Sequence, residues 1–128
     1  MRVITGTARG RVLRTLEGED VRPTTDRVKE AVFSIIQFEI EGRRVLDLFA
    51  GSGQLGIEAL SRGAASATFV DMSKDSLSAV KYNLEHTKLG DNAKVVQTDA
   101  LSFLKLTKDK FDIVFLDPPM RARSWSIR

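Results

Sequence analysis

Short apolar runs alternate with longer amphipathic stretches along most of the chain. Four apolar or β-branched runs have the length of strands, and they cover residues 45–49, 67–70, 94–97 and 113–116. Three stretches between them have helical patterns, and they cover residues 55–62, 74–87 and 101–106. Strands that alternate with helices in this way are typical of a parallel sheet covered by helices, so the pattern predicts an α/β fold.

The amino-terminal part of the chain has a different pattern. Residues 1–22 mix Arg, Gly and Thr with two short β-type runs, and they predict a small hairpin or an extended arm. After Pro23, either Thr24 or Thr25 can cap a helix. The apolar face predicted for this helix has i, i+3, i+4, i+7, i+8 spacing and consists of Val28, Ala31, Val32, Ile35 and Ile36.

Acidic residues end or follow the predicted strands. Right-handed crossovers bring the carboxyl ends of parallel strands to one edge of the sheet, where open α/β sheets bind their ligands. The residues expected at that edge are Asp47 with a glycine loop behind it, Asp71, Asp99 and Asp117. We therefore expect the functional site there.

The glycine loop is the first candidate for ligand binding. Gly51, Gly53 and Gly56 form a GxGxxG pattern between a strand and a helix, where glycines permit a tight turn and close approach of a ligand to the helix amino terminus. Asp71 ends the next strand, where a carboxylate can accept hydrogen bonds from both ribose hydroxyls. This arrangement suits a dinucleotide or an adenosyl cofactor equally well. Asp71 could instead cap the following helix.

Two further features favour the adenosyl sulfonium cofactor, S-adenosylmethionine. Asp47 lies four residues before the first glycine, where its charge favours a cationic cofactor and would repel a pyrophosphate. Asp99 and Ala100 follow the third strand, in position for a carboxylate or backbone contact with the adenine amine. The alternative for Asp99 is a helix cap.

The segment Asp117-Pro118-Pro119 predicts the reaction. An exocyclic base amine is a poor nucleophile because its lone pair is delocalised into the ring. A carboxylate from Asp117 and the carbonyl of Pro118, both accepting hydrogen bonds from the amine, would direct that lone pair at a methyl group. The two prolines would fix the carbonyl in place. The alternative is a plain turn after a strand.

Composition and charge narrow the class of protein. The 128 residues fit a single domain, and without cysteine there is no thiolate metal site or cysteine nucleophile. The absence of a membrane-spanning run or secretory signal predicts a cytoplasmic protein. The net charge is +3, and an acid-free amino-terminal stretch could follow a phosphate backbone or be a solvated face; it contains Arg2, Arg9, Arg11 and Arg14.

Several longer segments resemble a known family. They are residues 2–6, 9–11, 22–31, 45–53, 60–64 and 111–119, of which Arg-Pro-Thr-Thr-Asp-Arg-Val-Lys-Glu is the most specific. Over residues 1–119 the chain resembles the bacterial 16S ribosomal RNA guanine-N2 methyltransferases, class I enzymes that use S-adenosylmethionine. The resemblance implies a Rossmann-like methyltransferase fold and methylation of one guanine N2 within the small ribosomal subunit.

The motifs and the resemblance together predict roles for individual residues. Catalysis would involve Asp117, Pro118 and Pro119. Cofactor contacts would come from Asp47, Phe49, Gly51, Gly53, Asp71, Met72, Asp99 and Ala100. Residues near the cofactor or the RNA would be Arg9, Arg11, Arg22, Thr24, Thr25, Arg27 and Met120.

The chain departs from this family in two places. Met120 stands where the family has an aromatic residue that stacks on the extruded base, a contact worth roughly 1–3 kcal/mol. Residues 120–128 resemble no continuation of the family and form an atypical tail. The fourth strand, interior in the family, would then be an edge that invites pairing with a second copy, so a homodimer is expected through it.

Two other functions remain open at this stage. One is an inactive module that binds cofactor and RNA, dimeric through the fourth strand. The other is an NAD-dependent oxidoreductase, although nothing resembles an acid or base for hydride transfer. The single histidine, His86, falls in a polar helical stretch and is predicted to be solvated.

Overall fold

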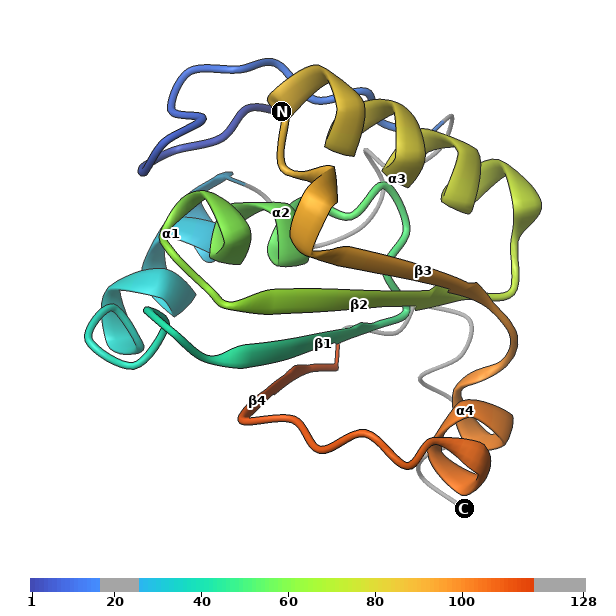
Figure 1. Ribbon diagram of the computed structural model, residues 1–128. Helices are drawn as coiled ribbons and strands as arrows, with labels where there is room; N and C mark the ends of the chain where they lie inside the picture. Colours follow the sequence, from blue (N-terminus) through green and yellow to red (C-terminus); the bar gives the residue numbers. More distant parts are fainter. Residues whose placement is uncertain (17–25, 117–128) are drawn as a thin grey trace.

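The computed structural model describes residues 1–16 and 26–116 and has the predicted alternation of strands and helices (Figure 1). In chain order the elements are α1 (Asp26–Ile35), β1 (Arg44–Leu48), α2 (Gln54–Ser61), β2 (Ser66–Asp71), α3 (Lys74–Thr87), a 3-10 turn (Gly90–Asn92), β3 (Ala93–Gln97), α4 (Ala100–Leu106) and β4 (Ile113–Phe115). From β1 onward, each predicted strand and helix begins and ends within one residue of these bounds.

The four strands form one parallel sheet in the order β3-β2-β1-β4. Asp47 on β1 is aligned with Phe69 on β2 and Phe115 on β4. The carboxyl ends of β1 and its two neighbours therefore lie at the same edge, as predicted for a Rossmann-like α/β fold.

The two faces of the sheet are covered differently. Among the described elements, helices α1, α2 and α3 cover one face, and α4 covers part of the other (Figure 1). The larger core, on the first face, includes Phe33, Val45, Ile57, Phe69 and Val80. The smaller core, under α4, consists of Leu46, Leu48, Val70 and Phe103. Alternate residues of β1 and β2 thus serve opposite faces, because side chains alternate along a strand.

The amino-terminal arm, residues 1–16, folds back on itself beside α2 and α3 (Figure 1). The predicted hairpin is present as a single antiparallel bridge between Arg2 and Val12. Val3, Ala8 and Leu13 are buried, so one side of the arm belongs to the larger core.

The predicted apolar face of α1 is correct for two of its five residues, Val32 and Ile36, and wrong for the other three. Helix α1 instead turns Lys29 and Phe33 inward, both fully buried, with Val32 and Ile36 half-buried beside them. Three residues of the predicted face are exposed, namely Val28, Ala31 and Ile35. A periodicity argument treats lysine as a surface residue, whereas the ammonium group of Lys29 is paired in the interior with Glu58, at 3.2 Å.

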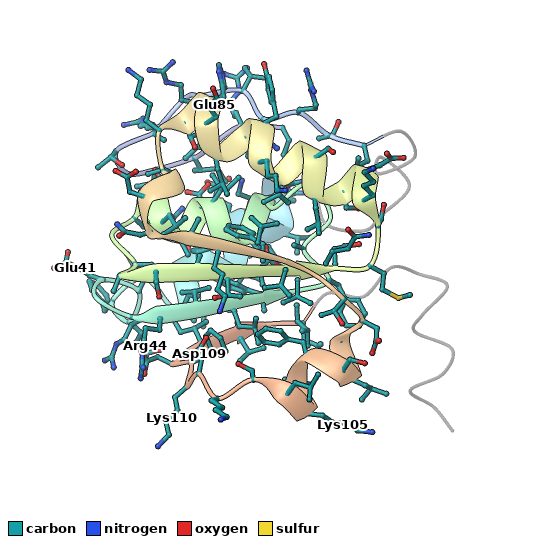
Figure 2. The ribbon with its side chains drawn as sticks, turned by 45° about the vertical axis from the view of Figure 1, so that its right-hand side comes forward. Glu41, Arg44, Glu85, Lys105, Asp109 and Lys110 are labelled. Carbon is teal, nitrogen blue, oxygen red and sulfur yellow. The ribbon has the colours of Figure 1, made fainter. Side chains whose placement is uncertain are left out.

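Charged side chains extend outward from the helices and loops, among them Glu85 on α3 and Lys105 on α4 (Figure 2). Within the part of the chain that is described, no helix has the length and apolar character needed to cross a membrane.

Candidate cofactor site

The turn from β1 into α2 forms the predicted glycine loop. Phe49 adopts a left-handed conformation with φ 73°, which for a non-glycine residue costs about 1–3 kcal/mol. The backbone N–H groups of Phe49 and Ala50 both donate to the carbonyl of Val70, at 3.1 and 2.9 Å. Gly51 and Gly53 are also left-handed, with φ 58° and 84°, and α2 begins immediately afterwards. The loop is thus a sharp reversal at the end of the sheet.

The amino terminus of α2 has no side-chain cap, since Gly53 occupies the cap position. The first N–H groups of a helix have no partner within that helix, and they favour a negatively charged or polar ligand group. The carbonyl oxygen of the Gln54 side chain is also buried, and none of the described residues donates a hydrogen bond to it.

Asp71 connects the loop to the end of β2. One carboxylate oxygen accepts a hydrogen bond from the N–H of Gly51 at 2.9 Å, and the other accepts from the N–H of Ser73 at 2.8 Å. The capping alternative for Asp71 is wrong, because Ser73 is the residue that caps α3. A carboxylate offers about four lone-pair sites. Asp71 therefore has acceptor capacity for ribose hydroxyls while it holds the loop in place.

Asp47 is buried behind the loop. Its carboxylate accepts a hydrogen bond from the N–H of Gly56 in the first turn of α2, at 3.0 Å. A side chain on Gly56 would collide with the ring of Phe69, so α2 packs unusually close to the sheet at this point. Asp47 thus positions α2 behind the loop, and its predicted contact with a cofactor stays a prediction.

Asp99 caps α4, as the structural alternative for this residue predicted. Its two oxygens accept hydrogen bonds from the N–H of Ser102 at 2.8 Å and from the Ser102 hydroxyl at 2.7 Å. These bonds lower the pKa of Asp99 below its usual value. The contact of Asp99 with adenine stays a prediction alongside this role. Ala100, the first residue of α4, and Phe49 both pack against the smaller core.

Comparison with known proteins identifies the family of this chain. The family described as Conserved hypothetical protein 95 matches residues 1–127. The chain belongs to that family. The ribosomal RNA small subunit methyltransferase D of Escherichia coli (strain K12) is 46% identical over 121 residues, which cover 94% of this chain and 61% of that protein.

Solved structures of related proteins have the same fold. The Escherichia coli protein yhhF has a TM-score of 0.85 at 45% identity, over 93% of this chain and 64% of that chain. SMU.776, solved in complex with SAH, has a TM-score of 0.63 at 26% identity, over 70% of this chain and 25% of that chain. The chain spans 61% to 67% of the length of three curated relatives.

The predicted residues not yet placed fall into two groups. Met72 directly follows β2 and is 70% exposed, and Arg9, Arg11 and Arg27 are also exposed. The remaining predicted residues lie outside the described part of the chain, namely Arg22, Thr24, Thr25, Asp117, Pro118, Pro119 and Met120. The strand that precedes Asp117 ends with Phe115 beside Asp47.

Three residues that hold the arm were not found from the sequence. Glu58 and Ser61 on α2 and Asn83 on α3 are all buried and bond to the arm. Their signal in the sequence is a polar residue on the buried face of an amphipathic helix. Asn83, for example, lies three and four residues after the buried Val80 and Ala79. Such a residue is buried only where it has hydrogen-bond partners.

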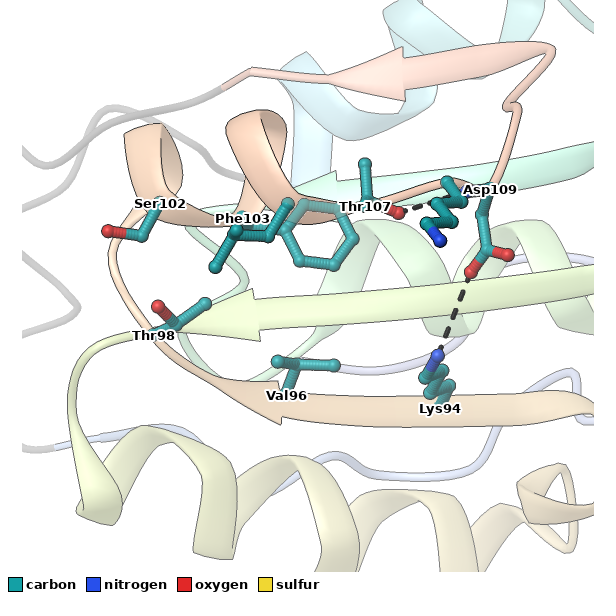
Figure 3. Close-up of a pocket in the computed structure, with 9 residues that line it drawn as sticks. Lys94, Val96, Thr98, Ser102, Phe103, Thr107 and Asp109 are labelled. Carbon is teal, nitrogen blue, oxygen red and sulfur yellow. Dashed lines mark hydrogen bonds and ion pairs between the residues drawn. The ribbon is translucent and has the colours of Figure 1, made fainter.

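A separate cavity of about 430 Å³ lies between β3 and α4 (Figure 3). Val96 and Phe103 form apolar walls, and an ion pair of 3.7 Å between Lys94 and Asp109 lies at one end. None of the predicted cofactor residues lines it. Within the described residues, no group of three or more His, Cys, Asp or Glu side chains could hold a metal ion.

Proposed function

We propose that this protein transfers a methyl group from S-adenosylmethionine to a guanine N2 amine of 16S ribosomal RNA. The single observation that supports this most is the Asp71 bridge to Gly51 at the joint end of β1 and β2, in a chain of this family. The names of the relatives support ribosomal RNA as the substrate. Guanine N2 as the acceptor rests on the resemblance and on the Asp-Pro-Pro segment.

The residues present fit the cofactor. Asp71 would accept hydrogen bonds from the ribose hydroxyls, since each oxygen has spare acceptor capacity. The start of α2, ahead of Gly56, whose N–H already donates to Asp47, would bind the carboxylate of the methionine end. Met72, exposed after β2, would cover the adenine, with Asp99 and Ala100 near its amine. When bound, the cofactor supplies an electrophilic methyl group.

The target amine would bind at the end of β4. Asp117 and the Pro118 carbonyl would accept its hydrogen bonds and direct the nitrogen lone pair at the methyl group, with Pro119 stiffening the backbone. Phe115, two residues before Asp117, is aligned with Asp47, so β4 leads to the same edge as the glycine loop. Met120 would contact the base.

The RNA would reach this edge across the arm. Arg9 and Arg11 are exposed in an arm that contains no acidic residue, which favours contacts with a phosphate backbone, and Arg27 is exposed near the start of α1. Arg22, Thr24 and Thr25 would complete this surface. Binding should then weaken steeply as salt concentration rises, because each phosphate contact releases counterions.

The cofactor is tested by thermal melting with S-adenosylhomocysteine, with NAD as the control ligand. Saturation at about a hundred times Kd should add about 2.7 kcal/mol of stability and raise the melting temperature by several degrees. Asp71→Asn should weaken this effect because it removes the negative charge and replaces one acceptor oxygen with an NH2 donor. A shift with NAD alone would favour an oxidoreductase and contradict the proposal.

The reaction is tested on small ribosomal subunits that lack the modification. Wild-type protein should produce N2-methylguanine in the 16S RNA, measured by mass spectrometry of nucleosides, and Asp117→Ala should lose most of that activity. Asp109→Asn, which changes an exposed carboxylate near the opposite edge of the sheet, is the matched control. Equal activity of Asp117→Ala and wild type would exclude the proposed role of Asp117.

A second candidate, a dimeric module that binds cofactor and RNA without catalysis, is favoured by the exposure of β4. In the described sheet β4 is an edge strand, and Val114 and Leu116 are 51% and 64% exposed. An apolar edge of this kind pairs readily with a second copy. Light scattering should then give twice the monomer mass, and Val114→Lys should restore the monomer. A monomeric wild-type protein would contradict this dimer.

A further inference from the structure

The arm and the glycine loop share one buried side chain. Asn83 on α3 is fully buried, and its carboxamide accepts a hydrogen bond from the N–H of Arg14 at 2.7 Å. Its NH2 group donates to the carbonyl of Arg14 at 2.9 Å and to the carbonyl of Ser52 at 3.0 Å. One amide therefore bonds to the end of the arm and to the middle of the loop.

The bond to Ser52 fixes a sensitive part of the loop. Ser52 lies between the two left-handed glycines, so its carbonyl belongs to the peptide that leads into Gly53, the cap of α2. Rotation of that peptide would change the direction of the N–H groups that follow. The hydrogen bond from Asn83 holds this peptide in one orientation, and the amide is in turn oriented by Arg14.

Arg14 is held at a second point. Its guanidinium lies 3.8 Å from the centre of the Tyr82 ring, one residue before Asn83 on the same helix. The other anchors of the arm, Glu58 and Ser61, bond to residues 4–8 and belong to α2. Among these three buried anchors, Asn83 is the one whose side chain also bonds to the glycine loop.

We propose that Asn83 is a positioning residue that couples RNA binding on the arm to cofactor binding in the glycine loop. RNA that holds the arm in its docked position keeps the Asn83 amide, and hence the Ser52 peptide, in the orientation that binds the cofactor. Coupling between two sites is reciprocal, so the cofactor also tightens the binding of RNA. The inference rests on the proposed function, since it assumes both ligands.

The test measures the Kd of S-adenosylhomocysteine by equilibrium dialysis, with and without a saturating concentration of unmodified small ribosomal subunits. Wild-type protein should bind the ligand about fivefold or more tightly when subunits are present, the lower range of common coupling factors. Asn83→Asp keeps the acceptor for Arg14 but loses both donors. In that variant the ratio of the two Kd values should fall close to one.

One matched pair and one further control separate coupling from general damage. Arg14→Pro removes both the arginine side chain and the backbone N–H that donates to Asn83. Arg14→Ala removes the side chain and keeps that N–H. Coupling should be lost in the first and kept in the second. Ser61→Ala removes an anchor of the arm that has no contact with the loop, so it should weaken subunit binding and leave the ratio unchanged. These arm variants still give an answer if Asn83→Asp does not fold.

The outcomes distinguish this inference from the proposed function. If wild-type protein binds S-adenosylhomocysteine and subunits independently, Asn83 couples nothing, although the proposed function stands. The same conclusion follows if Asn83→Asp or Arg14→Pro keeps the wild-type ratio, or if Ser61→Ala lowers it equally. If S-adenosylhomocysteine does not bind at all, the proposed function itself is wrong.

Discussion

The two faces of the sheet differ in how completely they are covered. On the face that carries α1, α2, α3 and the arm, the core includes fully buried residues from each of these helices and from the arm. On the other face, α4 covers a core of four residues, and three of its own leucines are exposed, namely Leu101, Leu104 and Leu106. The side chains on the first face are thus buried under helices and the arm, whereas the second face leaves apolar side chains of α4 exposed to water.

The faces also differ in their polar contacts. Glu58 on the arm face accepts hydrogen bonds from the N–H groups of Ile4 and Thr5, at 2.9 and 3.0 Å, and pairs with Lys29 and Arg62. The ion pair between Lys94 and Asp109 is exposed, and Asp109 lies near the start of the strands (Figure 2). Ion pairs of these two kinds should therefore contribute very differently to stability.

The largest expected effect is that of Glu58→Ala. It would leave the buried ammonium of Lys29 without its carboxylate, which costs about 3–5 kcal/mol and should lower the melting temperature by roughly 10 °C or more. Asp109→Asn breaks the exposed pair and should change the stability by about 0.5 kcal/mol or less. Equal effects in thermal denaturation would remove the contrast between the faces.

The next effect compares one phenylalanine from each core. Phe33→Ala should cost about 3–5 kcal/mol, since Phe33 is fully buried and packs against Phe115. Phe103→Ala should cost less, because Phe103 already borders the cavity beside α4 and its removal enlarges an existing space. Urea denaturation of both variants measures the difference. A larger loss of unfolding free energy for Phe103→Ala would show that the face under α4 contributes more to stability than the face under α1, α2 and α3.

A smaller effect isolates the contact between the arm and α2. Gly6 and Gly10 both have positive φ, but a side chain on Gly6 would overlap the carbonyl of Ser61, whereas one on Gly10 would meet nothing within 4 Å. Gly10→Ala should cost about 1–2 kcal/mol from backbone strain alone. Gly6→Ala should cost more and increase hydrogen exchange at the N–H of Ala8, which bonds to Ser61. Equal costs would mean that the arm is not closely docked.

The smallest expected effect is a dependence on pH. Burial alone would raise the pKa of Glu58, but hydrogen bonds from Ile4, Arg62 and Thr5 and the charge of Lys29 together lower it below the usual 4.5. A lowered pKa stabilises the fold above pH 4.5, and this contribution is lost as pH falls through the folded-state value. Melting curves of wild type and Glu58→Gln should therefore converge as the pH falls below 4.5.

The sequence was sufficient for the strands and the later helices because parallel strands buried on both faces are continuous apolar runs. It was not sufficient for α1, where one buried lysine rotates the helix away from the face that apolar spacing predicted. Pairing with Glu58, which lies 29 positions later in the chain, decides this orientation, and no local pattern contains it.

For the candidate site, the sequence predicted which residues lie together but not the role of each carboxylate. The glycine loop and Asp71 lie together as expected, since strand order and crossover geometry determine the edge of a parallel sheet. The choice between a cap and a ligand role depended on single hydrogen bonds. Ser73 caps α3, which leaves Asp71 to the loop, whereas Asp99 caps α4 itself. Periodicity does not distinguish these cases.

The stacking of Arg14 on Tyr82 provides an intrinsic probe of the arm. Tyr82 is the only tyrosine among the 128 residues. The ring of His86 is stacked on the Tyr82 ring, with 5.8 Å between the ring centres. His86 is therefore half-buried, whereas the sequence predicted a solvated side chain. An aromatic ring shifts the magnetic resonance frequencies of protons held above its face. The side-chain protons of Arg14 should therefore have displaced proton signals while the arm is docked, and a spectrum of the unlabelled protein would report its release.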